Sequence, residues 1–155
     1  MSTLYYIWPN GDQTYMKLIR RRASKLYPDG FTLLGSKFHP VGDFDSEDAK
    51  LPSEPLRIYK TKNGYRVFFI NRFNPDLNSM FDELKAMGGD PFYSKCGKER
   101  GFYACRISPK SLVLTDRVAV THLIRQTGEA LPEWENFIQY HDVATNAFDL
   151  DAPLF

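Results

Sequence analysis

Several common structural signals are absent from this 155-residue sequence, and their absence narrows what the protein can be. The chain has two cysteines, Cys96 and Cys105, which is too few for a disulfide scaffold or a cysteine-only zinc site. No stretch approaches the roughly 18 apolar residues of a membrane helix, and the N-terminus lacks the basic start of a signal peptide. We therefore expect a cytoplasmic protein that does not associate with a membrane.

Motifs that identify common enzyme classes are also missing. The sequence contains no P-loop, no Rossmann glycine pattern and no nucleophile elbow. The three histidines, His39, His122 and His141, are far apart and lack the spacing of metal ligands. The sequence therefore gives no signal for the enzyme classes built on these motifs.

The basic residues are unevenly distributed along the chain. All 20 lysines and arginines lie in residues 1–125 with 13 acids, whereas residues 126–155 carry six acids and no base. The first segment has an excess of seven positive charges, which would suit a polyphosphate or a nucleic acid. Alternatively, the two zones are an ordinary solvated surface on which opposite charges attract each other.

The expected elements form one α+β domain over residues 1–155. Extended segments are predicted at 4–8, 31–35, 37–46 and 101–108, with a hairpin at 56–73. Helices are predicted at 12–27, from Asn74 and Pro75 to Gly88, and from Pro132 onward; residues 118–124 fit either type. This βαββαβ order predicts an antiparallel sheet with helices on one face, connected like an RRM-like or ferredoxin-like palm with an added C-terminal helix.

The hairpin is the clearest of these elements. Asn63 and Gly64 predict a two-residue type I′ turn, which would pair Lys62 with Tyr65 and Thr61 with Arg66. One face of the hairpin would be core. The other would mix cations with aromatic rings and stay open on the sheet surface, which suits phosphates and bases. Alternatively, that face packs against the domain while its arginines extend to solvent.

The stretch "GDFDSED" at residues 42–48 could hold a metal ion. In a strand, Asp43 and Asp45 would lie on the same face, with Phe44 turned into the core. Two neighbouring carboxylates suit Mg²⁺, which is held by one or two carboxylates together with substrate phosphates. The alternative is a strand end that runs into a polar turn, where aspartate and serine form local hydrogen bonds.

Three segments together resemble the catalytic core of the archaeo-eukaryotic primase superfamily: "GDFDSED", "RIYKTKNGYRVFF" and "GFYACRISPKS". That family has a D-x-D strand for metal, a hairpin that grips nucleotide phosphates, and a later strand that often ends in a Pro-Ser stretch. Asp43 and Asp45 match the first motif, and the similarity covers roughly residues 37–111. The resemblance implies a primase-polymerase-like domain in which Asp43 and Asp45 are catalytic and bind Mg²⁺.

The cations of the hairpin and the matched motif positions Thr61, Arg66 and Ser108 together predict which residues meet a nucleotide or a single-stranded nucleic acid. These expected substrate-binding residues are Arg57, Lys60, Thr61, Lys62, Arg66, Arg106, Ser108 and Lys110. Arg66 stands where the family has histidine, and the candidates for a third carboxylate are Asp116 and Asp90. Both metal-dependent nucleotidyl transfer and a catalytically inactive relative therefore remain open.

A different reading is a non-enzymatic module that binds a protein partner. The aromatic and basic face of the hairpin could serve this purpose, as could the acidic segment 148–155, "FDLDAPLF". The simpler expectation for that segment is that Phe148, Leu150 and Phe155 pack on the domain's own core.

Overall fold

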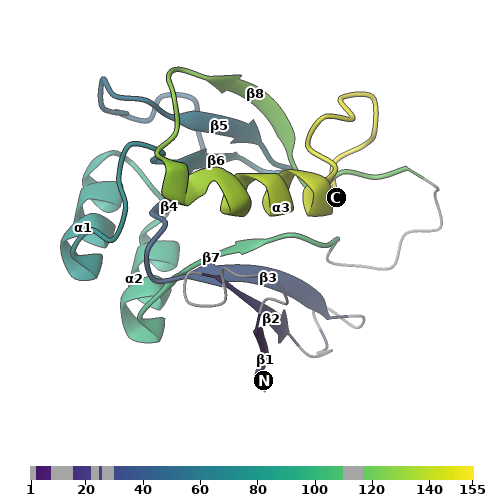
Figure 1. Cartoon of the computed structure of the whole chain (residues 1–155), viewed down its shortest axis with the longest axis horizontal. Helices are drawn as coiled ribbons and strands as arrows, with labels where there is room; N and C mark the ends of the chain where they lie inside the picture. Colours follow the sequence, from purple (N-terminus) through teal and green to yellow (C-terminus); the bar gives the residue numbers. More distant parts are fainter. Residues whose placement is uncertain (1–2, 8–15, 22–24, 26–29, 110–116) are drawn as a thin grey trace.

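The computed structural model describes residues 3–7, 16–21, 25, 30–109 and 117–155. Its strands form two antiparallel four-stranded sheets, in the orders β1-β2-β3-β7 and β4-β6-β5-β8 (Figure 1). The strands are β1 (Thr3–Ile7), β2 (Lys17–Arg21), β3 (Phe31–Ser36), β4 (Val41–Phe44), β5 (Arg57–Lys60), β6 (Tyr65–Phe68), β7 (Tyr103–Arg106) and β8 (His122–Gln126). The helices are α1 (Leu77–Ala86), α2 (Pro91–Arg100), the short 3-10 helix η1 (Pro132–Trp134) and α3 (Glu135–Thr145). The α+β class and the antiparallel pairing are as predicted.

The first sheet differs from the expectation at its second element. The helix predicted at 12–27 is wrong for residues 17–21, which form β2 between β1 and β3. The apolar spacing that indicated a helix includes Ile19, but Ile19 pairs with Leu33 across the sheet and is buried there. Pairing with two neighbouring strands outweighs local helical periodicity here. The element order is therefore not βαββαβ.

The second sheet contains the predicted hairpin with a longer loop. Lys60 pairs with Tyr65 and Tyr59 with Arg66, so the loop comprises residues 61–64 instead of two residues. The type I′ prediction is wrong, because neither Asn63 nor Gly64 has a positive φ. Since the register moves by two residues, each side chain keeps the face that was predicted for it.

The helices of the second half largely follow the prediction. α1 begins two residues later than predicted: its cap is Asp76, not Asn74, and the Asp76 side chain accepts a hydrogen bond from the Ser79 amide. The helix buries Met80, Phe81 and Leu84. α2 was not predicted; Asp90 caps it, and Pro91 occupies its first turn. Its weak apolar pattern has a simple reason. At Gly97, a Cβ atom would lie 2.1 Å from the Phe81 ring, so α2 packs on α1 through a residue with no side chain.

α3 covers the hairpin face that was expected to stay open (Figure 1). Tyr59 and Phe68 on that face are fully buried, and their rings contact His141 and Trp134 respectively. The expectation of an exposed aromatic and basic sheet face is therefore wrong. An aromatic face of this size is more stable when it is buried against the apolar side of a helix.

The C-terminal segment is attached to the domain at only some of its residues. Leu154 bridges to Ala119, His122 Nε2 lies 2.8 Å from the carbonyl oxygen of Ala152, and Ala152 is buried. Phe148 and Leu150, in contrast, are 66% and 60% exposed. The expectation that these two side chains pack on the core is wrong. Among the described residues, no helix is both long and apolar enough to cross a membrane.

Candidate functional site

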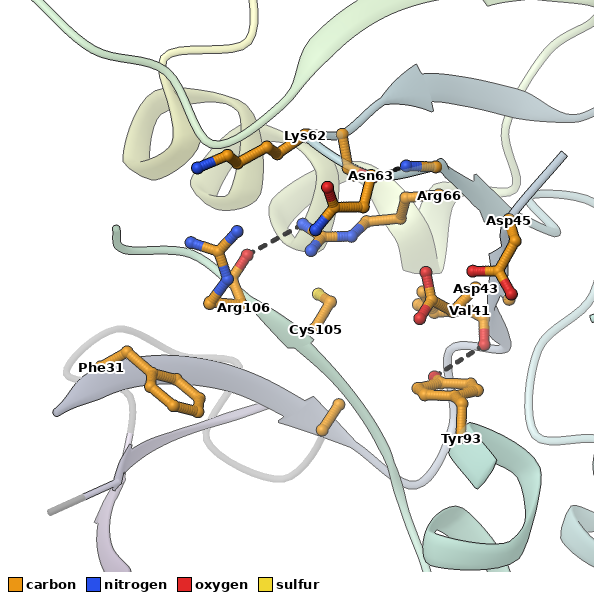
Figure 2. Close-up of a pocket in the computed structure, with 14 residues that line it drawn as sticks. Phe31, Val41, Asp43, Asp45, Lys62, Asn63, Arg66, Tyr93, Cys105 and Arg106 are labelled. Atoms are coloured by element: carbon orange, nitrogen blue, oxygen red, sulfur yellow. Dashed lines mark hydrogen bonds between the residues drawn. The ribbon is translucent and has the colours of Figure 1, made fainter. Parts of the chain in front are cut away.

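A cavity of about 250 Å³ lies where the two sheets meet, beside their edge strands β4 and β7 (Figure 2). Figure 2 shows Asp43 and Asp45 on one side of it, Lys62 and Arg106 on the other, and Arg66 between them. The full lining is Phe31, Val41, Gly42, Asp43, Asp45, Thr61, Lys62, Asn63, Gly64, Arg66, Tyr93, Ala104, Cys105 and Arg106. The structure thus brings six of the residues predicted for the site together.

The two aspartates lie side by side because of the strand geometry of β4. Asp43 is in the strand and Asp45 directly follows it, so both side chains reach the same wall of the cavity. Phe44, between them, turns the other way and is buried in the core, as predicted. The wall therefore presents two oxygen-donor groups of the kind that hard divalent cations prefer.

Arg66 is held in one orientation beside these carboxylates. It lies opposite Asp43 in the β4–β6 ladder and is only 8% exposed. Its Nη1 donates to the carbonyl oxygen of Arg106 at 2.9 Å and lies 3.0 Å from Nε2 of His141. The guanidinium is consequently an oriented cation at the cavity wall.

The hairpin loop supplies a second cation. Lys62 is exposed, lines the cavity and has its ammonium 5.5 Å from the Phe155 ring centroid. Thr61 also lines the cavity, and its hydroxyl accepts a hydrogen bond from the Gly64 amide at 3.1 Å. Lys60 instead donates to the carbonyl oxygens of Thr61 and Gly64 at 2.7 and 3.1 Å. Lys60 therefore stabilises the loop and does not line the cavity.

Of the residues predicted on and after β7, one lines the cavity and another has a structural role. Arg106 lines the cavity and donates from Nη1 to the carbonyl oxygen of Ser108 at 2.6 Å. The hydroxyl of Ser108 accepts from the Thr32 amide at 2.7 Å, which fixes the end of β7 on β3. Lys110 lies outside the described residues.

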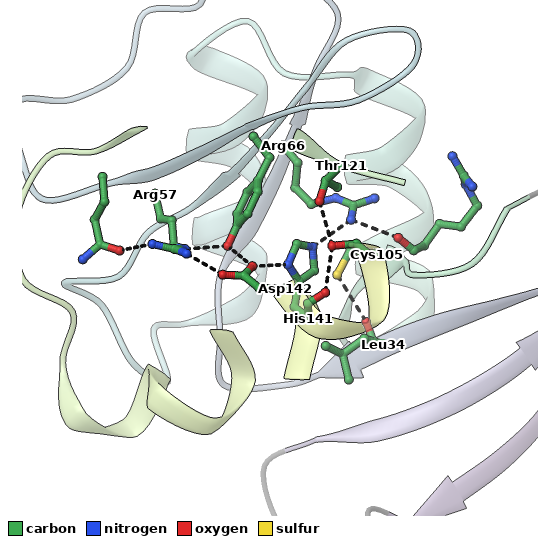
Figure 3. A network of polar contacts seen from close by, with 11 residues as sticks. Leu34, Arg57, Arg66, Cys105, Thr121, His141 and Asp142 are labelled. Atoms are coloured by element: carbon green, nitrogen blue, oxygen red, sulfur yellow. Dashed lines mark hydrogen bonds and ion pairs between the residues drawn. The ribbon is translucent and has the colours of Figure 1, made fainter. Parts of the chain in front are cut away.

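Arg57 lies away from the cavity, on the buried side of the hairpin under α3. It forms an ion pair with Asp142, whose side chain is nearly fully buried, and donates from Nη1 to Gln126 at 2.6 Å. Because Asp142 already neutralises this charge and Arg57 is not among the residues lining the cavity, Arg57 is not placed to contact a ligand there. It belongs to a buried polar network with Tyr59, Asp142 and His141 (Figure 3).

The network shifts the titration of its members. Burial, together with nearby Arg66 and Arg57, lowers the pKa of His141 from 6.5 to about 4, although Asp142 opposes this effect. Burial alone would raise the pKa of Asp142, but hydrogen bonds from His141, Tyr59 and Arg57 outweigh it and lower the pKa. Burial and the Asp142 charge raise the pKa of Tyr59. At neutral pH, His141 is therefore a neutral imidazole beside an ionised Asp142.

His141 and Asp142 were missed as site-related residues because no spacing in the sequence connects them to the hairpin. His141 is 75 positions from Arg66, and only its place on the inward side of the last helix hinted at a buried role. An adjacent histidine and aspartate on a buried helix face was the available signal.

A third carboxylate is not found at the cavity among the residues that the structure describes. The Asp90 side chain caps α2 by accepting from the Phe92 amide at 2.9 Å, and Asp116 lies outside the described residues. Within the described part of the chain, no group of three or more His, Cys, Asp or Glu side chains is arranged to hold a metal. A cation bound by Asp43 and Asp45 would complete its coordination with water or substrate oxygens, which Mg²⁺ commonly does.

The arrangement combines a pair of carboxylates with three cations around one small cavity. Such a site can hold a divalent metal and an anion next to each other, each reducing the repulsion within the other group. Comparison with protein-family models, with curated proteins and with solved structures finds no match to this chain.

Proposed function

We propose that the cavity binds the phosphate groups of a nucleoside polyphosphate together with Mg²⁺. The observation that carries this proposal is the convergence of Asp43, Asp45 and Arg66 on one cavity, with Lys62 and Arg106 on the same lining. These side chains come from three separate segments of the chain, namely the end of β4, the hairpin and β7, so their proximity is a property of the fold. The resemblance to a primase-polymerase domain predicts the same residues Asp43, Asp45 and Arg66 for this site.

The metal part of the proposal rests on Asp43 and Asp45. Both are on one wall of the cavity, where their oxygens can serve as ligands to the same hard cation. Mg²⁺ suits two carboxylates because its remaining positions are readily filled by water and phosphate oxygens. When bound, the ion would neutralise charge on the phosphates that it contacts.

The phosphate part rests on the cations that face the carboxylates. Arg66 can bind two phosphate oxygens at once, because its guanidinium is planar and its orientation is fixed. Lys62, on the exposed loop, adds a movable point charge at the rim. The cavity, at about 250 Å³, is below the roughly 300–1,000 Å³ of typical small-molecule sites, so the nucleoside would extend beyond it.

Binding, rather than nucleotidyl transfer, is the activity that these residues support. The described cavity offers two carboxylates, and Arg66 occupies the position of the family's histidine. An arginine binds phosphate well, but it does not act as a neutral imidazole.

The test is calorimetric titration with ATP in the presence of Mg²⁺ or of EDTA. Asp43→Asn should lower the affinity for Mg-ATP at least about tenfold, equivalent to about 1.4 kcal/mol, because one metal ligand loses its charge. Asp48→Asn is the matched control, since Asp48 is exposed in the same acidic stretch and outside the cavity lining. Unchanged affinity in Asp43→Asn, or equal binding with EDTA, would contradict the proposal.

A second candidate function is docking of a protein partner beside α3. A groove of about 530 Å³ is lined by Ile138, Val143 and Phe148, of which Val143 and Phe148 are 76% and 66% exposed. Exposed apolar side chains that gather in this way are typical of interaction surfaces. Since residues 126–155 carry six acids and no base, the partner that fits is a basic amphipathic segment.

A further inference from the structure

The orientation of Arg66 depends on two contacts made by one of its nitrogens. Nη1 carries two hydrogens, and it has two acceptors: the Arg106 carbonyl oxygen at 2.9 Å and His141 Nε2 at 3.0 Å. Nη1 is thus fully used inside the protein. Nε and Nη2 have no hydrogen-bond partner among the described residues, and Arg66 lines the cavity. The guanidinium therefore offers a two-nitrogen edge to a ligand.

The contact with His141 requires one particular tautomer of the imidazole. His141 Nδ1 lies 2.9 Å from Oδ1 of Asp142, a carboxylate that only accepts, so Nδ1 carries the proton. Nε2 then has a free lone pair and accepts a hydrogen bond from Arg66. A neutral histidine in this tautomer is the state in which both contacts are satisfied.

Asp142 is in turn fixed by a buried network on the far side of His141 (Figure 3). Its Oδ1 also accepts from the Tyr59 hydroxyl at 2.6 Å, and its Oδ2 forms the ion pair with Arg57. Arg57 Nε donates to the Tyr59 oxygen at 2.6 Å, which closes a ring of three side chains. The imidazole therefore has little freedom to rotate away from Arg66.

We propose that His141, which lies outside the cavity lining, is a positioning residue that presents Arg66 to a phosphate group. The inference rests on the proposed function, because it assigns Arg66 to a phosphate. His141 does not touch the ligand. By accepting one Nη1 hydrogen, it holds the guanidinium plane so that Nε and Nη2 point at the ligand together, which bidentate phosphate binding requires.

Two substitutions of His141 separate positioning from packing. His141→Phe keeps a flat ring in the core but removes the acceptor for Arg66. His141→Gln keeps an acceptor oxygen on a flexible side chain and is the conservative variant. His39→Phe is the matched control: His39 is also buried on the α3 side, stacks on Phe137, and bonds to Ser36 and Glu133.

The experiment measures the affinity of each full-length variant for inorganic triphosphate with Mg²⁺, together with its melting temperature. We expect His141→Phe to bind at least about tenfold more weakly, His141→Gln to stay within about threefold of wild type, and His39→Phe to bind like wild type. A purely structural role would lower the melting temperature of all three without this order of affinities. Wild-type affinity in a folded His141→Phe variant would overturn the proposal.

A second readout does not need the ligand. In ¹⁵N-labelled protein, a fixed Arg66 guanidinium gives slowly exchanging side-chain signals, and we expect His141→Phe to abolish them while Arg66→Gln identifies them. Unchanged Arg66 signals in His141→Phe would refute positioning whatever the ligand data show. If the wild-type protein binds no triphosphate but the Arg66 signals depend on His141, the proposed phosphate binding is refuted. The contact in which His141 holds Arg66 is then confirmed as structural only.

Discussion

At the scale of single residues, the ion pair between Arg57 and Asp142 shows that a cation in the right segment of the sequence can be unavailable to a ligand. Both side chains are nearly buried, and each has further hydrogen bonds to satisfy it. A buried pair of this kind is costly to break, because removing one partner leaves the other as an uncompensated charge. Counting cations on a predicted face therefore overstates the number that can meet a ligand.

His141 gives the protein a defined sensitivity to acid. Its pKa is about 4 in the folded chain against an ordinary 6.5, so between these values the unfolded chain binds a proton that the folded chain does not. Stability is therefore fully present above about pH 6.5, falls as the pH decreases, and by about pH 4 has lost on the order of 3 kcal/mol.

Denaturant unfolding at several pH values between 4 and 7 tests this prediction, with His141→Gln as the comparison. The variant has no titrating group at this position, so its unfolding free energy should fall less steeply over this window. The lowered pKa of Asp142 removes further stability as the pH falls through the ordinary aspartate value of 3.8, so it contributes at the acid end of this window in both proteins. Equal slopes for the two proteins would show that His141 is not the group responsible.

The sequence was informative about residues whose position follows from local geometry. Asp43 and Asp45 share a face because strand side chains alternate, and that rule needs no knowledge of the fold. Arg57, Lys60 and Arg66 lie in the same hairpin, yet only Arg66 reaches the cavity. What separates them is the position of α3 and the course of the loop, which local rules do not contain.

At the scale of elements, the hairpin was predicted correctly, but the reason given for the glycine at position 64 was wrong. The glycine was expected for its tolerance of positive φ, but its φ is not positive. Instead, a Cβ atom at this position would lie 2.2 Å from the carbonyl oxygen of Phe44. The loop thus packs directly on the end of β4, and this close approach brings Thr61 and Lys62 beside the two aspartates.

Gly64→Ala should therefore displace the loop. We expect a loss of about 1–3 kcal/mol in unfolding free energy, because the new methyl group meets backbone that has no rotamer to change. Mg-ATP affinity should fall as well, since Lys62 moves with the loop. Thermal or denaturant unfolding measures the first effect and calorimetry the second.

Asn63→Ala is the stability control for this substitution. Asn63 is exposed and has no positive φ, so its unfolding free energy should change by less than about 0.5 kcal/mol. In a type I′ turn the asparagine would instead hold a left-handed conformation that alanine disfavours. A large loss in Asn63→Ala with a small loss in Gly64→Ala would contradict the observed loop.

The secondary structure of two further elements could not be predicted from the spacing of apolar residues. β2 was predicted as helix because Tyr15, Ile19 and Ala23 are spaced by four, whereas strand pairing on both sides determines the structure of residues 17–21. The sequence predicts a loop where α2 forms, because the buried positions of this helix include Ser94 and Gly97, which are not apolar side chains. Asp90 followed by Pro91 was a usable start signal, because it combines a capping side chain with a proline in the first turn.

At the scale of the whole molecule, the cavity is produced by the meeting of two sheets. Asp43 lies on the edge strand of one sheet, Arg106 on the edge strand of the other, and Arg66 connects them through the Arg106 carbonyl. The sequence contains each residue but not the side-by-side placement of β4 and β7. That placement depends on contacts between distant segments.

The groove beside α3 leads to a prediction about the molecular surface. A lysine- and leucine-rich amphipathic peptide should bind, with an affinity that falls as salt increases, because the groove is apolar and its surroundings are acidic. Replacing Val143 and Phe148, the two exposed apolar residues of the groove lining, together by serine should weaken this binding at least about tenfold and leave Mg-ATP affinity unchanged. Fluorescence anisotropy of the labelled peptide measures the effect.

A peptide with glutamate in place of each lysine is the control for charge. It should not bind, since the same surroundings would repel it. Equal binding of both peptides, or wild-type binding by the Val143 and Phe148 variant, would contradict docking in this groove.

The contact between Arg66 and His141 has a consequence for synthesis of the chain on the ribosome. A nascent chain that has emerged as far as β7 already contains Asp43, Asp45 and Arg66, but not the helix that anchors the arginine. Until α3 emerges, Tyr59 and Phe68 lack their cover as well. The partly made protein thus leaves these two aromatic rings uncovered, and Arg66 gains its contact with His141 only after α3 has emerged.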